Sequence, residues 1–295
     1  MDLFWEYDSV EPVEEGWSSD KKYRVVRGDG TAYLLRVSPI ERLEAKRTEY
    51  RYMCQAAESG VPMCRPAGFG TSSDGVWSLQ GWIDGEGAET AVPRMSPDGQ
   101  YAAGVRAGEI LRRIHALPVP AALEDWEVRF NRKIERNLAR YRDCPVKIDG
   151  GEAFAEFVRA NRGLLRGRPQ CWQHGDYHIG NLMIADGEVV VIDFDRSDFG
   201  DPWEEFNRIV FCALVSPRFA AGRVDGYFDG HPPEDFWRLL ALYTANNALS
   251  SVPWAMSFWQ EDVDRAVEQG RILLGWYDGM RRTVPSWYTT TKTTP

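Results

Sequence analysis

The feature that most constrains this 295-residue chain is a pair of short apolar runs near its middle, Leu182–Ile184 and Val189–Ile192. Asp186-Gly187 separates them, and an Asp-Gly pair between apolar runs is typical of a tight β-hairpin turn. Three polar side chains flank the hairpin: Asp176, Asn181 and Asp193. Because a strand–turn–strand unit lies between Asn181 and Asp193, we expect rigid backbone to fix both side chains.

The spacing of these residues is typical of a site for phosphoryl transfer. In the segment HGDYHIGN, which begins at His174, histidine, aspartate and asparagine have the spacing of the kinase pattern H-R-D-x-x-x-x-N, with glycine replacing arginine. Asp193-Phe194-Asp195 stands where kinases carry D-F-G. Phosphoryl transfer needs positioning and charge stabilisation more than covalent chemistry. We therefore predict that Asp176 accepts the proton of an attacking hydroxyl, while Asn181 and Asp193 hold Mg²⁺ against phosphate oxygens.

These motifs, HGDYHIGN followed by IDFDRSDFGDPWEEF, resemble the aminoglycoside phosphotransferase family, a branch of the protein-kinase-like fold. The motifs lie within Cys171–Asn207, and the order of elements is compatible from about Gly16 to Tyr277. The resemblance implies a five-stranded nucleotide-binding N-lobe and a helical C-lobe that binds the substrate. It also implies that Asp176 is the catalytic base and that Asn181 and Asp193 are metal ligands.

Two histidines of the motif, His174 and His178, lie four residues apart, which is also a zinc-ligand spacing. The chain has only four histidines, so a zinc site would need a carboxylate, and the kinase spacing would then be a coincidence. We therefore disfavour zinc and expect His174 to support the loop by hydrogen bonding.

The remaining pattern predicts a two-lobed α+β protein, with a small antiparallel-sheet N-lobe over 1–84 and a mostly helical C-lobe over 85–295. In the N-lobe, Lys22–Arg27 and Thr31–Val37 are predicted to pair around Gly28-Asp29-Gly30, and Val76–Ile83 forms a further strand.

Helix signals separate and follow these strands. A capping box at Ser38-Pro39-Ile40-Glu41 predicts a helix that runs to about Glu58, where Gly60 and Pro62 stop it. In the C-lobe, Ser96-Pro97 opens the first helix, which ends near Leu117. The other helices are expected at about 124–142, 151–165, 201–214, 234–249 and 260–280.

Two further residues are predicted to serve the nucleotide. Kinases hold the α- and β-phosphates with a basic side chain on the third strand, paired with a glutamate of the following helix. Arg36 stands where lysine is usual, and Glu49 is the matching glutamate. Arginine binds carboxylate or phosphate through parallel hydrogen bonds, so we expect the role to survive; the alternative is an ordinary surface ion pair.

The loop that would cover the phosphates has a weaker signature. The chain has no G-x-x-x-x-G-K-[ST] motif, and no G-x-G-x-x-G precedes the first hairpin. Ser18 and Ser19 lie in the segment where this loop is expected, and their hydroxyls and backbone amides are candidate phosphate ligands. The same segment also fits a simple polar turn.

Acidic residues are dense just after the central hairpin. Asp195, Asp198, Asp201, Glu204 and Glu205 fall within eleven residues. Asp201-Pro202-Trp203-Glu204 has the form of a capping box, which is a sufficient structural reason for Asp201 and Glu204. The density itself suits a cationic, hydroxyl-rich substrate, so Asp195, Asp198, Glu204 and Glu205 are candidate substrate ligands.

Composition narrows the partners and the location. The net charge of −9 disfavours nucleic acid and anionic membranes as partners. The five cysteines are scattered without a C-x-x-C pair, the N-terminus lacks a signal-peptide pattern, and no apolar run could span a bilayer. We therefore expect a cytoplasmic protein with reduced cysteines.

These features predict Mg²⁺-dependent transfer of the γ-phosphoryl group of ATP or GTP to a hydroxyl of a small cationic molecule. An aminoglycoside-type antibiotic is the first expectation. A metabolic kinase of the same fold, acting on choline, homoserine or an amino sugar, is the alternative. A non-catalytic nucleotide-binding module is disfavoured because base and metal ligands are all present. A protein kinase is disfavoured because too few residues separate Asp193 from Asp201 for a long activation loop. The sequence leaves the oligomeric state open.

Overall fold

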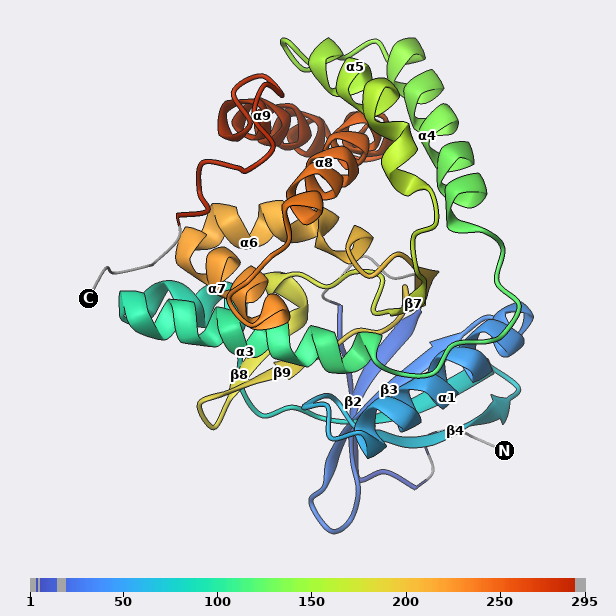
Figure 1. The fold of residues 1–295 in the computed structure, drawn as a ribbon. Helices are drawn as coiled ribbons and strands as arrows, with labels where there is room; N and C mark the ends of the chain where they lie inside the picture. Colours follow the sequence, from blue (N-terminus) through green and yellow to red (C-terminus); the bar gives the residue numbers. More distant parts are fainter. Residues whose placement is uncertain (1–3, 5, 15–19, 290–295) are drawn as a thin grey trace. The chain divides into compact units, whose positions relative to one another are not determined.

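The computed structural model describes residues 4, 6–14 and 20–289 of the chain (Figure 1). Its contacts group into two compact units. The first unit comprises Met1–Ala91, His174–Asp176 and Gly180–Ser197, and the second comprises Val92–Gln173, Tyr177–Ile179 and Asp198–Pro295. The central hairpin therefore makes its contacts in the first unit, although it follows most of the helices in sequence. The lobe limits of 1–84 and 85–295 stay a prediction.

The first unit contains an antiparallel five-stranded sheet, as the family resemblance implied. Its order is β1 (Ser9–Pro12), β2 (Lys21–Val26), β3 (Ala32–Ser38), β5 (Gly75–Gly81) and β4 (Pro66–Ser72). The predicted hairpin is present, since Lys22 lies opposite Arg36 and the turn contains Gly30 at a φ of 83°. Val25, Leu35 and Leu79 form the buried apolar centre of the sheet. Arg36 lies on β3, the middle strand of this sheet, and its side chain is buried.

One helix follows the third strand. A 3₁₀ turn, η1 (Ile40–Arg42), leads into α1 (Leu43–Glu58), which ends at the predicted residue with Gly60 at a φ of 77°. The predicted capping box at Ser38 is wrong. Ser38 is the last residue of β3, paired with Val76, and Pro39 holds the cap position of the 3₁₀ turn, which no side chain caps. One face of α1 is buried, and this face includes two charged residues, Lys46 and Glu49.

The central hairpin consists of β8 (Leu182–Ala185) and β9 (Glu188–Val191), with β6 (Glu86–Gly87) beside β8 and α2 (Ala88–Ala91) following β6. Its turn is the predicted one, because Asp186 and Gly187 both have positive φ, at 50° and 81°. Leu182 lies opposite Val191. The register therefore brings the residues just outside the strands, Asn181 and Ile192, next to each other.

The second unit is built mostly of helices (Figure 1). Its α-helices are α3 (Pro97–His115), α4 (Trp126–Asp143), α5 (Glu152–Asn161), α6 (Ile209–Val215), α7 (Pro217–Phe228), α8 (Glu234–Ala255) and α9 (Gln260–Trp276). Its 3₁₀ helices are η2 (Val92–Arg94), η3 (Arg162–Leu165) and η5 (Glu204–Arg208), and η4 (Ile179–Asn181) spans the junction with the first unit. Two short strands, β7 (Cys171–Gln173) and β10 (Asp198–Gly200), pair antiparallel.

Sequence reasoning predicted most of these helices but missed α7. The signal was present, because Ser216 caps α7 by accepting a hydrogen bond from the backbone N–H of Phe219, and Pro217 occupies the first turn. The predicted cap of α3 is confirmed, since Ser96 accepts from the N–H of Gly99 at 3.1 Å.

Helices α3 and α7 lie side by side in close contact (Figure 1). Four glycines, spaced four apart on each helix, make this approach possible: Gly104, Gly108, Gly222 and Gly226. A Cβ atom at any of them would overlap backbone atoms of the opposite helix. Small residues at this spacing let two helix backbones approach closely, so α3 and α7 form a rigid pair.

The core of the second unit lies around α8, whose buried residues pack with those of α4, α5 and α9. No helix within the described ranges is long and apolar enough to cross a bilayer.

Candidate active site

The ends of the central hairpin hold the two predicted metal ligands. The N–H of Ile192 donates to the carbonyl oxygen of Asn181 at 3.1 Å, so Asp193 follows directly on the residue paired with Asn181. The Asn181 side-chain Nδ2 donates to the carbonyl oxygen of Asp176 at 2.9 Å. This bond uses the nitrogen of the amide and leaves its oxygen, the atom that ligates cations, for a ligand.

His174, the predicted support of this loop, makes two hydrogen bonds to backbone groups. It is fully buried, and its Nε2 lies 2.9 Å from the carbonyl oxygen of Ile192. A carbonyl can only accept, so Nε2 carries a proton. Nδ1 accepts from the backbone N–H of Asp176 at 3.3 Å. Both bonds fit one neutral imidazole, which ties the backbone of the predicted base to the segment that carries Asp193.

Gly175 occupies the position where the kinase pattern has arginine. Its φ is 84°, and a Cβ atom there would overlap the carbonyl oxygen of Arg196. Only glycine combines this conformation with so close an approach of two backbone segments. The departure from the kinase pattern thus has a local steric cause.

The two carboxylates named for chemistry differ in their surroundings. The Asp176 side chain is 16% exposed, and its Oδ2 lies 3.7 Å from Nη1 of Arg196. Asp193 has a positive φ of 64°, and its side chain is 41% exposed. A carboxylate open to solvent on this scale is accessible to a metal ion.

Arg36 contacts Asp193 directly. Its guanidinium is 3% exposed, with Nη1 2.5 Å from Oδ1 of Asp193. Its Nη2 lies 3.5 Å from Oδ2 of Asp20 and 3.6 Å from Oδ2 of Asp195. Burial alone would raise the pKa of Asp193, but the charge and hydrogen bond of Arg36 outweigh burial and hold that pKa below its ordinary value.

The second buried cation is Lys46 of α1. Its Nζ lies 3.1 Å from Oε2 of Glu49 and 3.0 Å from Oδ2 of Asp20, and it also contacts Asp195. Glu49 therefore pairs with Lys46, whereas Arg36, its predicted partner, contacts three aspartates. Burial raises the pKa of Glu49, against the opposing charge of Lys46.

A third cation, Arg42, contacts Asp20 at 3.1 Å and Asp195 at 3.4 Å. We call the whole group the charge cluster: Asp20, Arg36, Arg42, Lys46, Glu49, Asp193 and Asp195. Sequence reasoning missed Asp20, Arg42 and Lys46. The spacing of Lys46, three residues before Glu49 on one helix face, could have indicated it. Ser18 and Ser19 lie outside the described residues, so their role stays a prediction.

The predicted substrate ligands already have partners within the protein. Asp195 belongs to the charge cluster. In the second unit, Asp198 forms an ion pair with Arg129, and Glu204 lies 2.8 Å from Nζ of Lys133. Glu205 is buried, accepts from the N–H of Tyr177 at 3.4 Å and lies 3.7 Å from Nε2 of His115. Much of this negative charge is thus compensated internally.

Asp201 and Glu204 do not form the predicted capping box. Asp201 accepts from the N–H of Trp203 at 2.8 Å, but its buried carboxylate also binds Arg168 through two bonds of 2.6 and 2.9 Å. The hydroxyl of Tyr243 donates to it at 2.7 Å. Glu204 contacts Lys133 and Gln173 instead of reaching back to the helix start. The motif is therefore an anchor of the helical core.

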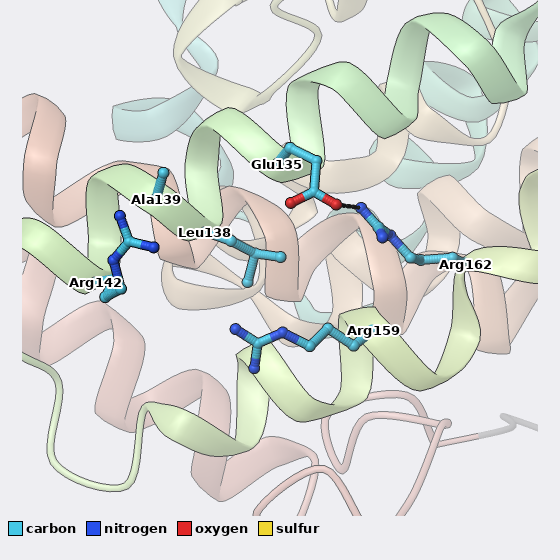
Figure 2. Close-up of a pocket in the computed structure, with 6 residues that line it drawn as sticks. All are labelled: Glu135, Leu138, Ala139, Arg142, Arg159 and Arg162. Atoms are coloured by element: carbon cyan, nitrogen blue, oxygen red, sulfur yellow. Dashed lines mark hydrogen bonds and ion pairs between the residues drawn. The ribbon is translucent and has the colours of Figure 1, made fainter.

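A separate pocket of about 170 Å³ lies between α4 and the α5–η3 segment of the second unit (Figure 2). Figure 2 shows Arg142, Arg159 and Arg162 around it, with Arg162 paired to Glu135. None of the predicted site residues lines it. It offers no carboxylate arrangement for phosphoryl transfer, so the candidate active site is the group of residues described above.

Comparison with known proteins decides the family. A model of the phosphotransferase enzyme family matches residues 9–238. The chain belongs to this family. This confirms the resemblance seen in the motifs, and with it an enzyme that transfers phosphoryl groups to an alcohol group of a small molecule. No curated protein sequence matches the chain.

Solved structures place this phosphotransferase in the protein-kinase-like fold. Aminoglycoside phosphotransferase APH(4)-Ia has a TM-score of 0.68 at 16% identity, covering 92% of this chain and 95% of that one. A choline/ethanolamine kinase family protein from Mesorhizobium loti has a TM-score of 0.67 at 17% identity, covering 96% and 94%. Amicoumacin kinase hAmiN, in complex with AMP-PNP, Ca²⁺ and Ami, has a TM-score of 0.65 at 13% identity, covering 93% and 90%. At these identities the likeness shows the fold.

Proposed function

We propose that this phosphotransferase moves the γ-phosphoryl group of ATP or GTP, with Mg²⁺, to a hydroxyl of a small cationic molecule, an aminoglycoside-type antibiotic. The observation that carries the proposal is the arrangement at the central hairpin. Asp176 lies on the loop before the hairpin, Asn181 at its start and Asp193 just after its end. The Asn181 amide donates to the carbonyl oxygen of Asp176, and the carbonyl oxygen of Asn181 accepts from the N–H of Ile192, the residue before Asp193. Phosphoryl transfer needs these groups in this order.

The roles follow from the chemistry of each group. Asp176 is the acceptor for the proton of the substrate hydroxyl, since it is a carboxylate of the motif whose backbone His174 and Asn181 fix. Proton removal at the attacking oxygen lets that oxygen form its bond to phosphorus while the bond to the nucleotide oxygen breaks. Arg196 beside Asp176 supplies positive charge near the reacting groups.

The residues at the hairpin also fit Mg²⁺. Hard divalent cations of this size bind carboxylate and amide oxygens. At the two ends of the hairpin, Asp193 offers a partly exposed carboxylate and Asn181 an amide oxygen. Bound there, Mg²⁺ would neutralise charge on the phosphate oxygens. Arg36, held against Asp193, adds a fixed positive charge at the same place.

A cationic acceptor is supported by the charge of the chain, −9, and by exposed acids such as Asp198, whose side chain is 55% exposed. Two similar structures are complexes of aminoglycoside phosphotransferases, one with AMP-PNP and hygromycin B and one with gentamicin. The second candidate is a metabolic kinase of a small cationic alcohol such as choline. The similarity to the choline/ethanolamine kinase family protein, with nearly the same TM-score, favours it.

The test is nucleotide consumption with ATP and GTP, plus Mg²⁺, across aminoglycosides, choline, homoserine and amino sugars. Mass spectrometry should detect one added phosphate on the true acceptor. In Asp176→Ala we expect turnover to fall by at least about a thousandfold, because the proton acceptor is gone. Binding of MgADP should stay within about twofold, since Asp176 does not contact the nucleotide in this scheme.

The matched control is Asp186→Asn, which removes a carboxylate from the turn of the same hairpin, away from the proposed base, and tolerates the positive φ of 50°. It should keep turnover. Phosphate on choline alone would favour the second candidate over the antibiotic. Equal turnover in Asp176→Ala and the wild type would contradict the assignment of the base.

A further inference from the structure

The charge cluster contains a buried lysine to which the proposed function gives no role. Lys46 is 4% exposed, and its Nζ contacts three carboxylates, those of Asp20, Glu49 and Asp195. An ammonium group has three N–H donors and no more. Hydrogen bonds to Glu49 and Asp195 use two of these donors, and Oδ2 of Asp20 lies 3.0 Å from Nζ. A phosphate could therefore bind Lys46 only by displacing a carboxylate.

Arg36 is arranged differently. A guanidinium has five N–H donors in a rigid fork, and one end of this fork lies against Asp193, the proposed metal ligand. The Asp193 side chain is 41% exposed, whereas those of Asp20, Glu49 and Lys46 are 9% exposed or less. The Arg36 side chain is as enclosed as that of Lys46, at 3% and 5%, but of the two only Arg36 contacts the partly exposed Asp193.

In kinases a single strand lysine contacts the nucleotide phosphates and also pairs with the helix glutamate. We propose that this chain divides that work between two cations. Arg36 contacts the phosphates, and Lys46 is a positioning residue that takes the pair with Glu49. This inference rests on the proposed nucleotide-dependent function.

Lys46 connects α1 to residues outside the helix. Lys46 and Glu49 both belong to α1, so their pair cannot attach the helix to the strand that carries Arg36. Lys46 attaches α1 through its other two partners instead. Asp20 directly precedes β2, and Asp195 follows β9 and the metal ligand Asp193. Without Lys46, its three carboxylate partners, Asp20, Glu49 and Asp195, would compete for Arg36 and draw it away from the phosphates.

The experiment restores the arrangement usual in kinases. MgADP affinity is measured by calorimetry for the wild type, Lys46→Met, Arg36→Lys and the double variant Arg36→Lys/Lys46→Met, at a temperature where circular dichroism shows each to be folded. We expect Lys46→Met to weaken binding by about ten- to a hundredfold. The double variant should bind at least about tenfold better than Lys46→Met, because a strand lysine can take over Glu49. Arg47→Met, which removes an exposed cation of α1 paired with Glu44, is the control and should bind like the wild type.

A second comparison separates positioning from direct phosphate contact. If Lys46 acts by keeping Arg36 available to the phosphates, Lys46→Met should cost little more in an Arg36→Met background, because the two residues act as one unit. Losses that multiply would mean that Lys46 contacts phosphate itself and would overturn the proposal, as would a double variant no better than Lys46→Met. A wild-type protein that fails to bind MgADP would instead refute the proposed function, and this inference with it.

Discussion

Acidic residues share cations in the first unit, whereas Asp201 and Glu204 of the second unit each pair with a cation of their own. In the charge cluster, Arg36 and Lys46 each contact three carboxylates, and Arg42 contacts two. In the second unit, Asp201 takes Arg168 and Glu204 takes Lys133. Three cations and four acids leave the cluster one negative charge in excess, whereas the pairs are balanced.

Shared cations and separate ion pairs respond differently when a ligand binds. A cation that serves three acids can shift among them when a metal ion or a phosphate arrives, because no single contact is indispensable. A cation bound to one buried acid cannot leave without exposing an uncompensated charge. Shared charge therefore suits a site that must accept ligands, and separate pairs suit a core that must not change. The predictions below test this distinction.

The largest effect on stability is expected at Asp201. Asp201→Asn leaves Arg168, whose side chain is only 15% exposed, without a carboxylate. Removing one partner of a buried ion pair costs about 3–5 kcal/mol of unfolding free energy. Chemical denaturation should measure this loss, while MgADP affinity of the remaining folded protein should be unchanged. A loss below about 1 kcal/mol would mean that Asp201 is no more than a surface cap.

A smaller and pH-dependent effect is expected at Arg36. In the wild type the folded-state pKa of Asp193 is held below its ordinary value, so this contribution to stability is present above about pH 3.9 and is lost at lower pH. In Arg36→Met, burial is no longer opposed, and the pKa of Asp193 should rise, which makes the ionised carboxylate destabilising near neutral pH. We expect Arg36→Met to cost about 2 kcal/mol at pH 7, less than a fully buried pair because Asp193 is partly exposed.

Denaturation curves between pH 7 and pH 4 provide the measurement. The gap between wild type and Arg36→Met should narrow as the pH falls, because protonation of Asp193 removes the need for its partner. Arg47→Met should show no such trend, since its pair with Glu44 is exposed. A gap that stays constant with pH would show that Arg36 stabilises the unit through packing alone.

The sequence predicts the local elements of the site but not its ion pairs. The hairpin, its Asp186-Gly187 turn and the strand position of Arg36 follow from local patterns, because turn chemistry and alternation act over a few residues. The partner of Glu49 is left open, because helix spacing favours Lys46, the kinase pattern favours Arg36, and only the fold decides which one reaches it. The acids after the hairpin were assigned to a substrate from their density. Density cannot reveal that Arg129, Lys133 and Arg168, distant in sequence, contact them.

Smallest of all should be the effect of Asp198, the exposed acid that the density argument assigned to the substrate. The side chains of its ion pair are well exposed, 34% for Arg129 and 55% for Asp198. Asp198→Asn should therefore change the unfolding free energy by less than about 1 kcal/mol. If Asp198 attracts a cationic acceptor, the KM for that acceptor should rise about threefold at low salt, with kcat and MgADP affinity unchanged. The rise should fade above about 0.3 M salt, because exposed charges are screened. An unchanged KM at low salt would place Asp198 with the structural pairs, and attraction of the substrate would then depend on other acids.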